Sequence, residues 1–158
     1  MAIVVTTNAT QRDLETIVKL LQQEQSLTPR SLDSLQASTV AIARDGKQVV
    51  GWVVSEHLYG SVYELGAAYV LPAYRQKGLL SRLLDACRND TATYVAALFS
   101  PQLVEYVCAN KGFKATTLKH IIAVSHWRFI TKRIKVGGRV AKHLSNQKAL
   151  FVIRSAIV

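Results

Sequence analysis

The feature that most constrains this fold is a change of hydrophobic period in the middle of the chain. Residues 63–70 form an apolar, β-rich run that ends before Pro72. Apolar residues then recur at helical spacing from Leu79 to Cys87, and the loop before this helix carries two cations and Gly78. A strand, a basic glycine loop and a helix in this order present backbone N–H groups and the positive end of a helix dipole to a ligand. The stretch therefore predicts an anion site that suits a diphosphate.

The loop differs from the two common nucleotide-binding motifs. Its spacing is neither the Gly-x-x-x-x-Gly-Lys of nucleoside triphosphate loops nor the three-glycine dinucleotide fingerprint, so those cofactors are disfavoured. On these residues alone, an ordinary strand-to-helix turn with exposed cations at Arg75 and Lys77 is the simpler interpretation.

The rest of the chain alternates between strand and helix periods. Residues 120–134 fit either a strand or a helix, and Gly137-Gly138 marks a break. The other predicted elements are a strand at 4–5, a helix capped by Thr10 and Asp13, a short helix opening at Thr28-Pro29, a hairpin turning at Asp45-Gly46, strands at 49–55 and 93–98, a helix at 101–110 and a final strand within 149–157.

Length and composition favour one cytoplasmic domain. A chain of 158 residues with 49% apolar residues can bury one core, so we expect a single domain over residues 1–158. Its apolar runs fall short of the ~20 residues that span a bilayer, so no membrane partner is expected. The first residues lack a signal-peptide pattern, and two cysteines cannot form a disulfide framework. A reducing, cytoplasmic location is the expectation.

The positive charge is confined to the last third of the chain. Residues 1–105 hold nine Lys/Arg and ten Asp/Glu, whereas residues 106–158 hold eleven Lys/Arg and no acidic residue. Such asymmetry is typical of a surface that binds nucleic acid or another polyanion, and a solvated basic face explains it equally well. Trp127, Phe129 and Phe151 lie among these cations and could stack on RNA bases, although we expect them in the core.

Residues 64–78 resemble the acyl-coenzyme A signature of the GNAT superfamily of N-acyltransferases. In that signature a strand ending in Val-x-Pro-x-Tyr-Arg precedes a glycine loop and a helix. Residues 50–52 after the hairpin and residues 110–114, with their Lys-Gly-Phe, are also similar to the family. The resemblance covers residues 1 to about 115, whereas the basic residues 116–158 match it poorly.

The resemblance implies an α/β (α+β) fold of GNAT type. A mixed, mostly antiparallel central sheet is flanked by helices, and its fourth and fifth strands splay in a V. The implied cofactor is acetyl-CoA or another acyl-CoA, with the pantetheine arm on the fourth strand and the pyrophosphate in the loop. Leu80 departs from the glycine or alanine of the family pattern and adds bulk near the pyrophosphate. The implied cofactor-binding residues are Val70, Leu71, Arg75, Gln76, Lys77, Gly78, Leu79 and Leu80.

The implied reaction is direct attack of a primary amine on the thioester through a tetrahedral intermediate. A backbone N–H near Val70 would bind the oxyanion, and Glu64 could accept the amine proton, although an ordinary strand carboxylate explains Glu64 as well. Relatives often place a tyrosine acid four residues before the glycine of Gly-Phe, where this chain has Cys108. Tyr106 lies two residues away, about 200° around a helix, so it replaces that tyrosine only in another register. Loss of the acid altogether is a further alternative.

Three functions follow from these observations. The first is an acetyltransferase acting on an amine-bearing small molecule or macromolecule. The second is a weakly catalytic or non-catalytic module whose basic residues 106–158 bind nucleic acid or another polyanion. The third is an acyltransferase whose acceptor is itself a large anion, such as a charged transfer RNA. The four histidines and two cysteines lack metal-ligand spacing, so no metal is assigned, and a homodimer is an open alternative to a monomer.

Overall fold

A computed structural model describes residues 2–24, 27–135 and 149–157 of the chain. The chain forms two compact units. Unit 1 contains Met1–Glu56 and Leu65–Asn89, and unit 2 contains His57–Glu64 and Asp90–Val158. The third and fourth strands, β3 (Gln48–Tyr59) and β4 (Val62–Val70), each begin in one unit and end in the other.

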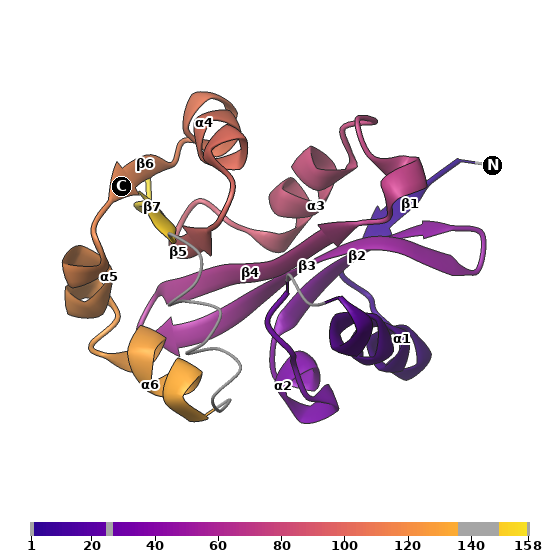
Figure 1. Ribbon diagram of the computed structural model, residues 1–158, viewed down its shortest axis with the longest axis horizontal. Helices are drawn as coiled ribbons and strands as arrows, with labels where there is room; N and C mark the ends of the chain where they lie inside the picture. The colour runs from indigo at the N-terminus through magenta and orange to yellow at the C-terminus, as the bar shows by residue number, and fades with distance from the viewer. Residues whose placement is uncertain (1, 25–26, 136–148, 158) are drawn as a thin grey trace. The chain divides into compact units, whose positions relative to one another are not determined.

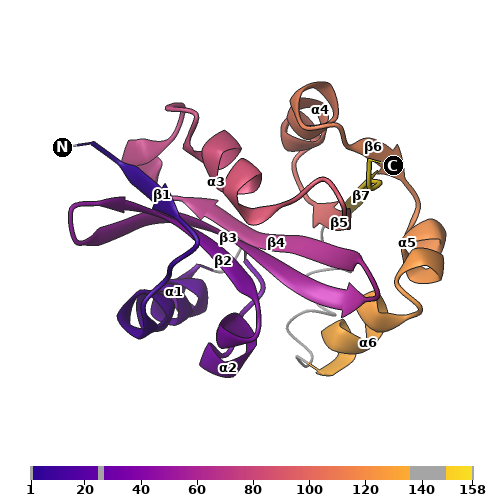
Figure 2. The same cartoon turned by 180° about the vertical axis from the view of Figure 1, so that it is seen from behind.

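Unit 1 is a twisted set of strands with helices on both faces (Figure 1). The first two helices lie on one face and α3 lies on the other, as the view from behind also shows (Figure 2). Besides β3 and β4, its elements are β1 (Val4–Thr6), α1 (Gln11–Gln23), α2 (Leu32–Gln36), β2 (Thr39–Asp45), a 3-10 turn at Pro72–Tyr74 and α3 (Leu79–Cys87).

The core of unit 1 lies between the first two helices and the strands. Apolar residues of α1 recur at i, i+3 and i+7, so that its buried stripe meets the sheet. Trp52 of β3 is fully buried in this core, and its ring centroid lies 5.2 Å from that of Tyr69 on β4. The fully buried or nearly buried members are Leu14, Ile17, Leu21, Leu35, Val40, Ile42, Val49, Trp52 and Val54.

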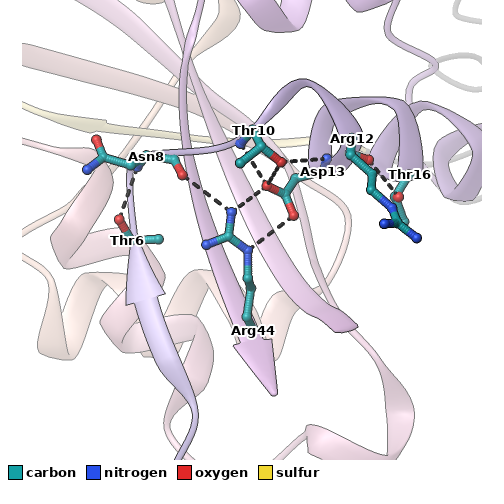
Figure 3. Close-up of polar contacts among 7 residues, drawn as sticks. All are labelled: Thr6, Asn8, Thr10, Arg12, Asp13, Thr16 and Arg44. Atoms are coloured by element: carbon teal, nitrogen blue, oxygen red, sulfur yellow. Dashed lines mark hydrogen bonds and ion pairs between the residues drawn. The ribbon is translucent and has the colours of Figure 1, made fainter. Parts of the chain in front are cut away.

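A polar network ties the start of α1 to β2 (Figure 3). Thr10 and Asp13 form the predicted capping box, in which the Thr10 N–H donates to the Asp13 carboxylate at 2.7 Å. Arg44 of β2 donates from Nε to Asp13 Oδ1 at 3.1 Å and also binds Oδ2. The hydrogen bond from Arg44 lowers the pKa of Asp13 from 3.8 to about 2, against the opposing effect of burial.

The described part of unit 2 holds three further strands and three helices. Its core joins Leu58 at the end of β3 to Val95, Ile121 and Phe129. Its elements are β5 (Thr93–Leu98), α4 (Pro101–Asn110), β6 (Lys114–Thr116), α5 (Leu118–Val124), α6 (Arg128–Lys135) and β7 (Leu150–Arg154).

The sheet order is β1-β2-β3-β4-β5-β7-β6. Antiparallel pairs join β1 to β2, β2 to β3, β5 to β7 and β7 to β6, whereas β4 and β5 are parallel. The expected mixed, mostly antiparallel sheet flanked by helices is therefore confirmed. The ladder between the fourth and fifth strands joins only three residue pairs, from Val62↔Thr93 to Glu64↔Val95.

Several predicted boundaries need correction. The second helix begins at Leu32 behind the N-cap Ser31, whose hydroxyl accepts from the Ser34 N–H, so it does not start at Thr28. The ambiguous stretch 120–134 forms most of two helices, α5 and α6, with a turn between them. The strand β6 was not predicted. The predicted break at Gly137-Gly138 lies outside the described residues. Within the described ranges, no helix is long and apolar enough to cross a membrane.

Candidate functional site

The fourth strand presents an open edge at its carboxyl end in unit 1. The Leu71 N–H donates to the Val50 C=O of β3 at 2.9 Å. Because adjacent residues in an extended strand direct their N–H and C=O groups to opposite edges, those of Val70 point away from β3. Among the described residues, the ladder on that other edge ends at Glu64, so the later part of β4 has no strand partner there in unit 1. This edge can accept an extended ligand by main-chain hydrogen bonds.

A left-handed residue interrupts β4 before this edge. Ala67 has φ 48, a conformation that L side chains rarely adopt inside a strand. Such a residue bends a strand and re-aims the groups beyond it, and interruptions of this kind are frequent beside active sites. Sequence reasoning missed it, and the only available signal is the run of small residues 66–68.

Gly51 on β3 lets β4 and α3 approach closely in unit 1. A Cβ at this position would lie 3.0 Å from the Tyr69 carbonyl oxygen, 3.2 Å from Val70 Cγ2 and 3.3 Å from Leu83 Cδ1. The first distance is tighter than nine in ten real Cβ contacts, and its partner is a backbone oxygen that cannot rotate away. Gly51 therefore fixes the position of β4 just before the basic loop.

The loop after β4 exposes a series of backbone amides. Gln76 and Gly78 have φ 60 and φ 69, and residues 75–78 are exposed. Alternation into the left-handed region turns successive N–H groups toward one side and makes an anion-binding concavity. The first i→i−4 bond of α3 runs from the Arg82 N–H to the Gly78 C=O at 3.2 Å. The amides of residues 79–81 therefore precede the helical ladder and are available to a ligand.

The loop side chains are held by local contacts. Arg75 Nε donates to the Val70 C=O at 2.9 Å, and its guanidinium lies 5.5 Å from the Tyr69 ring centroid. Lys77 Nζ donates to the Ala73 C=O at 3.2 Å. The Tyr74 hydroxyl donates to Asp45 at 3.0 Å, which joins the loop to the predicted hairpin and raises the pKa of Tyr74. Both cations thus remain exposed beside the free amides.

The first turn of α3 supplies apolar side chains behind the loop. Leu79 is buried, whereas Leu80, which departs from the family pattern, is half-buried. The Leu80 N–H precedes the helical ladder, so it remains a donor at the start of the helix despite the larger side chain. Both main-chain groups of Leu71 already have partners, because its C=O accepts from the Tyr74 N–H at 2.8 Å. The predicted cofactor-binding residues Val70–Leu80 all lie together in unit 1.

The predicted base lies in an ion pair in unit 2. Glu64 is 4% exposed, and Arg133 of α6 donates to both carboxylate oxygens, at 3.2 Å from Nη1 and 2.5 Å from Nη2. Arg133 Nη1 also donates to the Phe129 C=O at 2.9 Å, and the guanidinium lies 3.5 Å from the Phe129 ring centroid. Sequence reasoning missed Arg133, since nothing local connects residues 69 positions apart.

The predicted acids lie on α4 in unit 2. Val107 is buried, and its neighbours Tyr106 and Cys108, 100° to either side on the helix, are both half-buried. Among the described residues, no hydrogen bond or ion pair joins Glu64 to Tyr106 or to Cys108. The structure therefore places the two alternatives on either side of one buried stripe. No group of three or more His, Cys, Asp or Glu side chains in the described ranges is arranged to hold a metal ion.

Comparison with known proteins identifies a family and a fold. The model of the acetyltransferase (GNAT) family matches residues 9–95, which is more than half of the chain. Among curated proteins, none matches the sequence.

Solved structures of similar fold come from several bacteria. The chain superposes on the Rv2747 protein of Mycobacterium tuberculosis, solved with CoA, with TM-score 0.65 and 15% identity over 98% of this chain and 99% of that one. It matches the ribosomal-protein-S18-alanine N-acetyltransferase of Escherichia coli with TM-score 0.64 and 13% identity, covering 99% and 96% of the two chains. It also matches 36% of the N-acetylglutamate synthase of Neisseria gonorrhoeae, solved with coenzyme A and N-acetyl-glutamate, over 100% of this chain with TM-score 0.66 and 14% identity.

Proposed function

Because the chain belongs to the acetyltransferase (GNAT) family, we propose that it transfers an acetyl group from acetyl-CoA to a primary amine. The observation that carries this proposal is the loop of unit 1, where Gln76 and Gly78 are left-handed and the first amides of α3 lie outside the helical ladder. Structural neighbours solved with coenzyme A support a CoA-type cofactor.

The residues of unit 1 fit the parts of such a cofactor. A pyrophosphate needs several converging donors, and the amides of residues 76–81, which precede the helical ladder, would supply them together with the exposed Arg75 and Lys77. The pantetheine arm carries amides that can pair with an open strand edge, which β4 offers at Val70. We assign the arm contact to the Val70 C=O, which keeps one lone pair besides the bond from Arg75, rather than to Leu71, because both main-chain groups of Leu71 already have partners.

The chain's own groups can assist acyl transfer at two points. The bound cofactor would supply a carbonyl activated by its thioester and a thiolate that leaves readily. The Val70 N–H, directed away from β3, is our proposed donor to the carbonyl oxygen as negative charge develops there. This donor is part of the backbone, so it places no demand on the side chain.

Glu64 is the proposed acceptor of the amine proton. A carboxylate has about four lone-pair sites, and Arg133 occupies one on each oxygen of Glu64. An amine can therefore donate to Glu64 while the ion pair stays closed. Arg133 then acts as a positioning residue that holds the carboxylate in one orientation.

Protonation of the leaving thiolate is assigned to α4. Cys108 occupies the position that the family resemblance implies for the acid, and Tyr106 is its alternative on the same helix. Separate Cys108→Ala and Tyr106→Phe variants, each assayed over a pH range, identify the donor by loss of the alkaline limb of the kcat profile. The CoA thiolate leaves easily, so we expect the loss of kcat to be partial.

The decisive experiment measures acetyl-CoA binding by calorimetry. Gly78→Glu places a carboxylate in the loop, and we expect binding to weaken by at least about 100-fold, since an acidic side chain opposes a pyrophosphate. Gly60→Glu is the matched control, because Gly60 also has positive φ and open space around its Cα. Absence of binding by the folded wild-type chain, or equal loss in both variants, would overturn the proposal.

A further inference from the structure

The corner between α5 and α6 in unit 2 is a tight helix-ending motif (Figure 1). The His126 N–H donates to the Ala123 C=O at 3.4 Å, and the Trp127 N–H donates to the Ile122 C=O at 3.1 Å. These two bonds are the Schellman pattern, whose left-handed position is normally glycine or asparagine. Here His126 occupies that position with φ 47. The chain therefore carries an aromatic side chain at a left-handed position that favours glycine or asparagine.

The next residue is a stronger departure. Trp127 has φ 66, so two consecutive non-glycine residues are left-handed, and a bulky residue in this region is an outlier. Its side chain is 64% exposed, so burial does not compensate for the strain. Strained residues that packing does not explain concentrate at binding sites. The expectation of a core position for Trp127 was wrong, whereas Phe129 is buried as expected.

A second exposed aromatic residue completes the corner. Tyr59, at the end of β3, is 46% exposed and stacks on the His126 ring with centroids 4.1 Å apart and planes at 29°. We call Tyr59, His126 and Trp127 the aromatic corner. The Tyr59 and His126 rings are held by stacking, and the turn fixes the backbone of Trp127, so less freedom is lost when a planar ligand binds.

Exposed cations flank the aromatic corner along the chain, in a stretch that contains no acidic residue. Lys119 and His120 of α5 and Arg128 of α6 are exposed, and residues 106–158 contain no acidic residue. Of the three acids in unit 2, Glu64 is bound by Arg133 and Asp90 is bound by Arg154. Exposed aromatic rings with neighbouring cations are the components of a surface for unpaired bases and their phosphates.

A membrane surface fits this corner less well. An interfacial helix must leave its apolar face free to enter the lipid. On α6, Phe129 is buried and Ile130 packs against the core of unit 2, so these side chains are already used. In the described part of the corner, Tyr59 already stacks on His126, and Trp127 is the most exposed apolar side chain. Stacking on a base needs only one exposed ring, whereas insertion into a membrane needs a continuous apolar face of a helix.

We propose that the aromatic corner and its neighbouring cations bind a single-stranded nucleic acid. One base stacks on Trp127, and Arg128 and Lys119 contact the adjacent phosphates. The site belongs to unit 2 alone and does not depend on cofactor binding. A negative result for this site would therefore not count against the proposed acetyltransferase activity, and the reverse also holds.

The test uses a labelled 12-nucleotide oligo(U) RNA, oligo(dT) of the same length and a 12-bp DNA duplex. We expect both single strands to bind more tightly than the duplex, with affinity that falls as salt rises. The chain has two tryptophans, and Trp52 is fully buried, so stacking on Trp127 should quench the exposed, red-shifted part of the fluorescence. Equal binding of the duplex without this quenching would overturn the proposal.

Trp127→Gly separates binding from stability. Glycine adopts positive φ without strain, so this variant should melt at the same temperature as the wild type or higher. Its affinity for oligo(U) should fall by about 10-fold or more, as expected for the loss of one stacked base. Phe99→Ala, at another exposed aromatic residue of unit 2, is the control and should bind normally.

Two results would contradict this assignment. The first is wild-type affinity for oligo(U) in a folded Trp127→Gly variant. The second is quenching of Trp127 by vesicles of phosphatidylserine and phosphatidylcholine without any response to oligo(U), which would identify a membrane as the partner. Arg128→Gln should lower oligo(U) affinity and reduce its salt dependence, because it removes one phosphate contact.

Discussion

The two units of this molecule build binding surfaces in different ways. In unit 1 the anion site consists of backbone amides, two left-handed residues and a close approach at Gly51. In unit 2 the notable features are side chains, namely the Glu64–Arg133 pair and the aromatic corner. Unit 1 contains nine basic and seven acidic residues, whereas unit 2 contains eleven and three. The difference teaches that the anion site proposed for unit 1 needs little net charge, because helix and loop amides would supply the donors.

The match to the family follows the same division. The family model covers residues 9–95, which includes most of unit 1 and ends in β5. The fold persists in solved structures that are only 13 to 15% identical to this chain, and a site made of backbone tolerates many side chains. Side-chain features such as Arg133 belong to the part of the chain beyond that match. Unit 2 is therefore where we expect the properties particular to this protein.

The largest effect is expected in unit 2, at the buried ion pair. Glu64→Ala leaves the Arg133 guanidinium, only 17% exposed, without its carboxylate. Removing one partner of a buried pair lowers the free energy of unfolding by about 3 kcal/mol or more. Urea unfolding followed by circular dichroism measures this loss. Glu105→Ala, at an exposed carboxylate on α4, should change stability by less than about 0.5 kcal/mol. Equal effects of the two substitutions would show that the pair contributes nothing.

The next effect tests the close approach in unit 1. Gly51→Val places a branched side chain against the Tyr69 carbonyl and Leu83, and we expect a loss of about 2 kcal/mol from overpacking. Gly51→Ala should fall between the wild type and the valine variant. Since β4 leads into the basic loop, acetyl-CoA affinity should decline in the same order. Calorimetry on both variants measures this affinity. An unchanged affinity in a less stable variant would show that the position of β4 does not affect binding at the loop.

The smallest effect concerns the network at the start of α1 and appears on acidification. The pKa of Asp13 is about 2 in the folded chain and 3.8 ordinarily, because Arg44 donates to its carboxylate. Between these values the unfolded state binds more protons, so the stabilisation is complete above about pH 4 and is lost as the pH falls through 2. Asp13→Asn should cost about 1 to 2 kcal/mol at pH 7 and flatten this acid dependence.

The control for this prediction is Asp33→Asn in the first turn of α2, where the carboxylate is exposed. It should leave both the stability at pH 7 and the acid slope close to those of the wild type. Denaturant unfolding at several pH values distinguishes the two variants. An identical acid slope in wild type and Asp13→Asn would contradict the role of the Arg44 contact.

Sequence reasoning succeeded where structure depends on neighbours in the chain. The Thr10 capping box, the hairpin at Asp45-Gly46 and the start of α3 after Gly78 are all local, since each is made by residues a few positions apart. It failed at the start of the second helix because Ser31 competes with Thr28 as a cap and lies nearer the apolar residues. It left residues 120–134 ambiguous because a turn between two short helices breaks the period of either element.

The sequence by itself determined the family, the order of the main elements and the loop that we propose for a pyrophosphate, because these follow from local periodicity and a short motif. Only the tertiary structure showed that Arg133 binds Glu64 and that Tyr59 stacks on His126, since these partners lie far apart in the chain. It also decided that Trp127 is exposed while Phe129 is buried. Near a turn between two short helices, the turn decides whether an apolar side chain points inward or outward. The turn depends on backbone angles that residue type does not dictate.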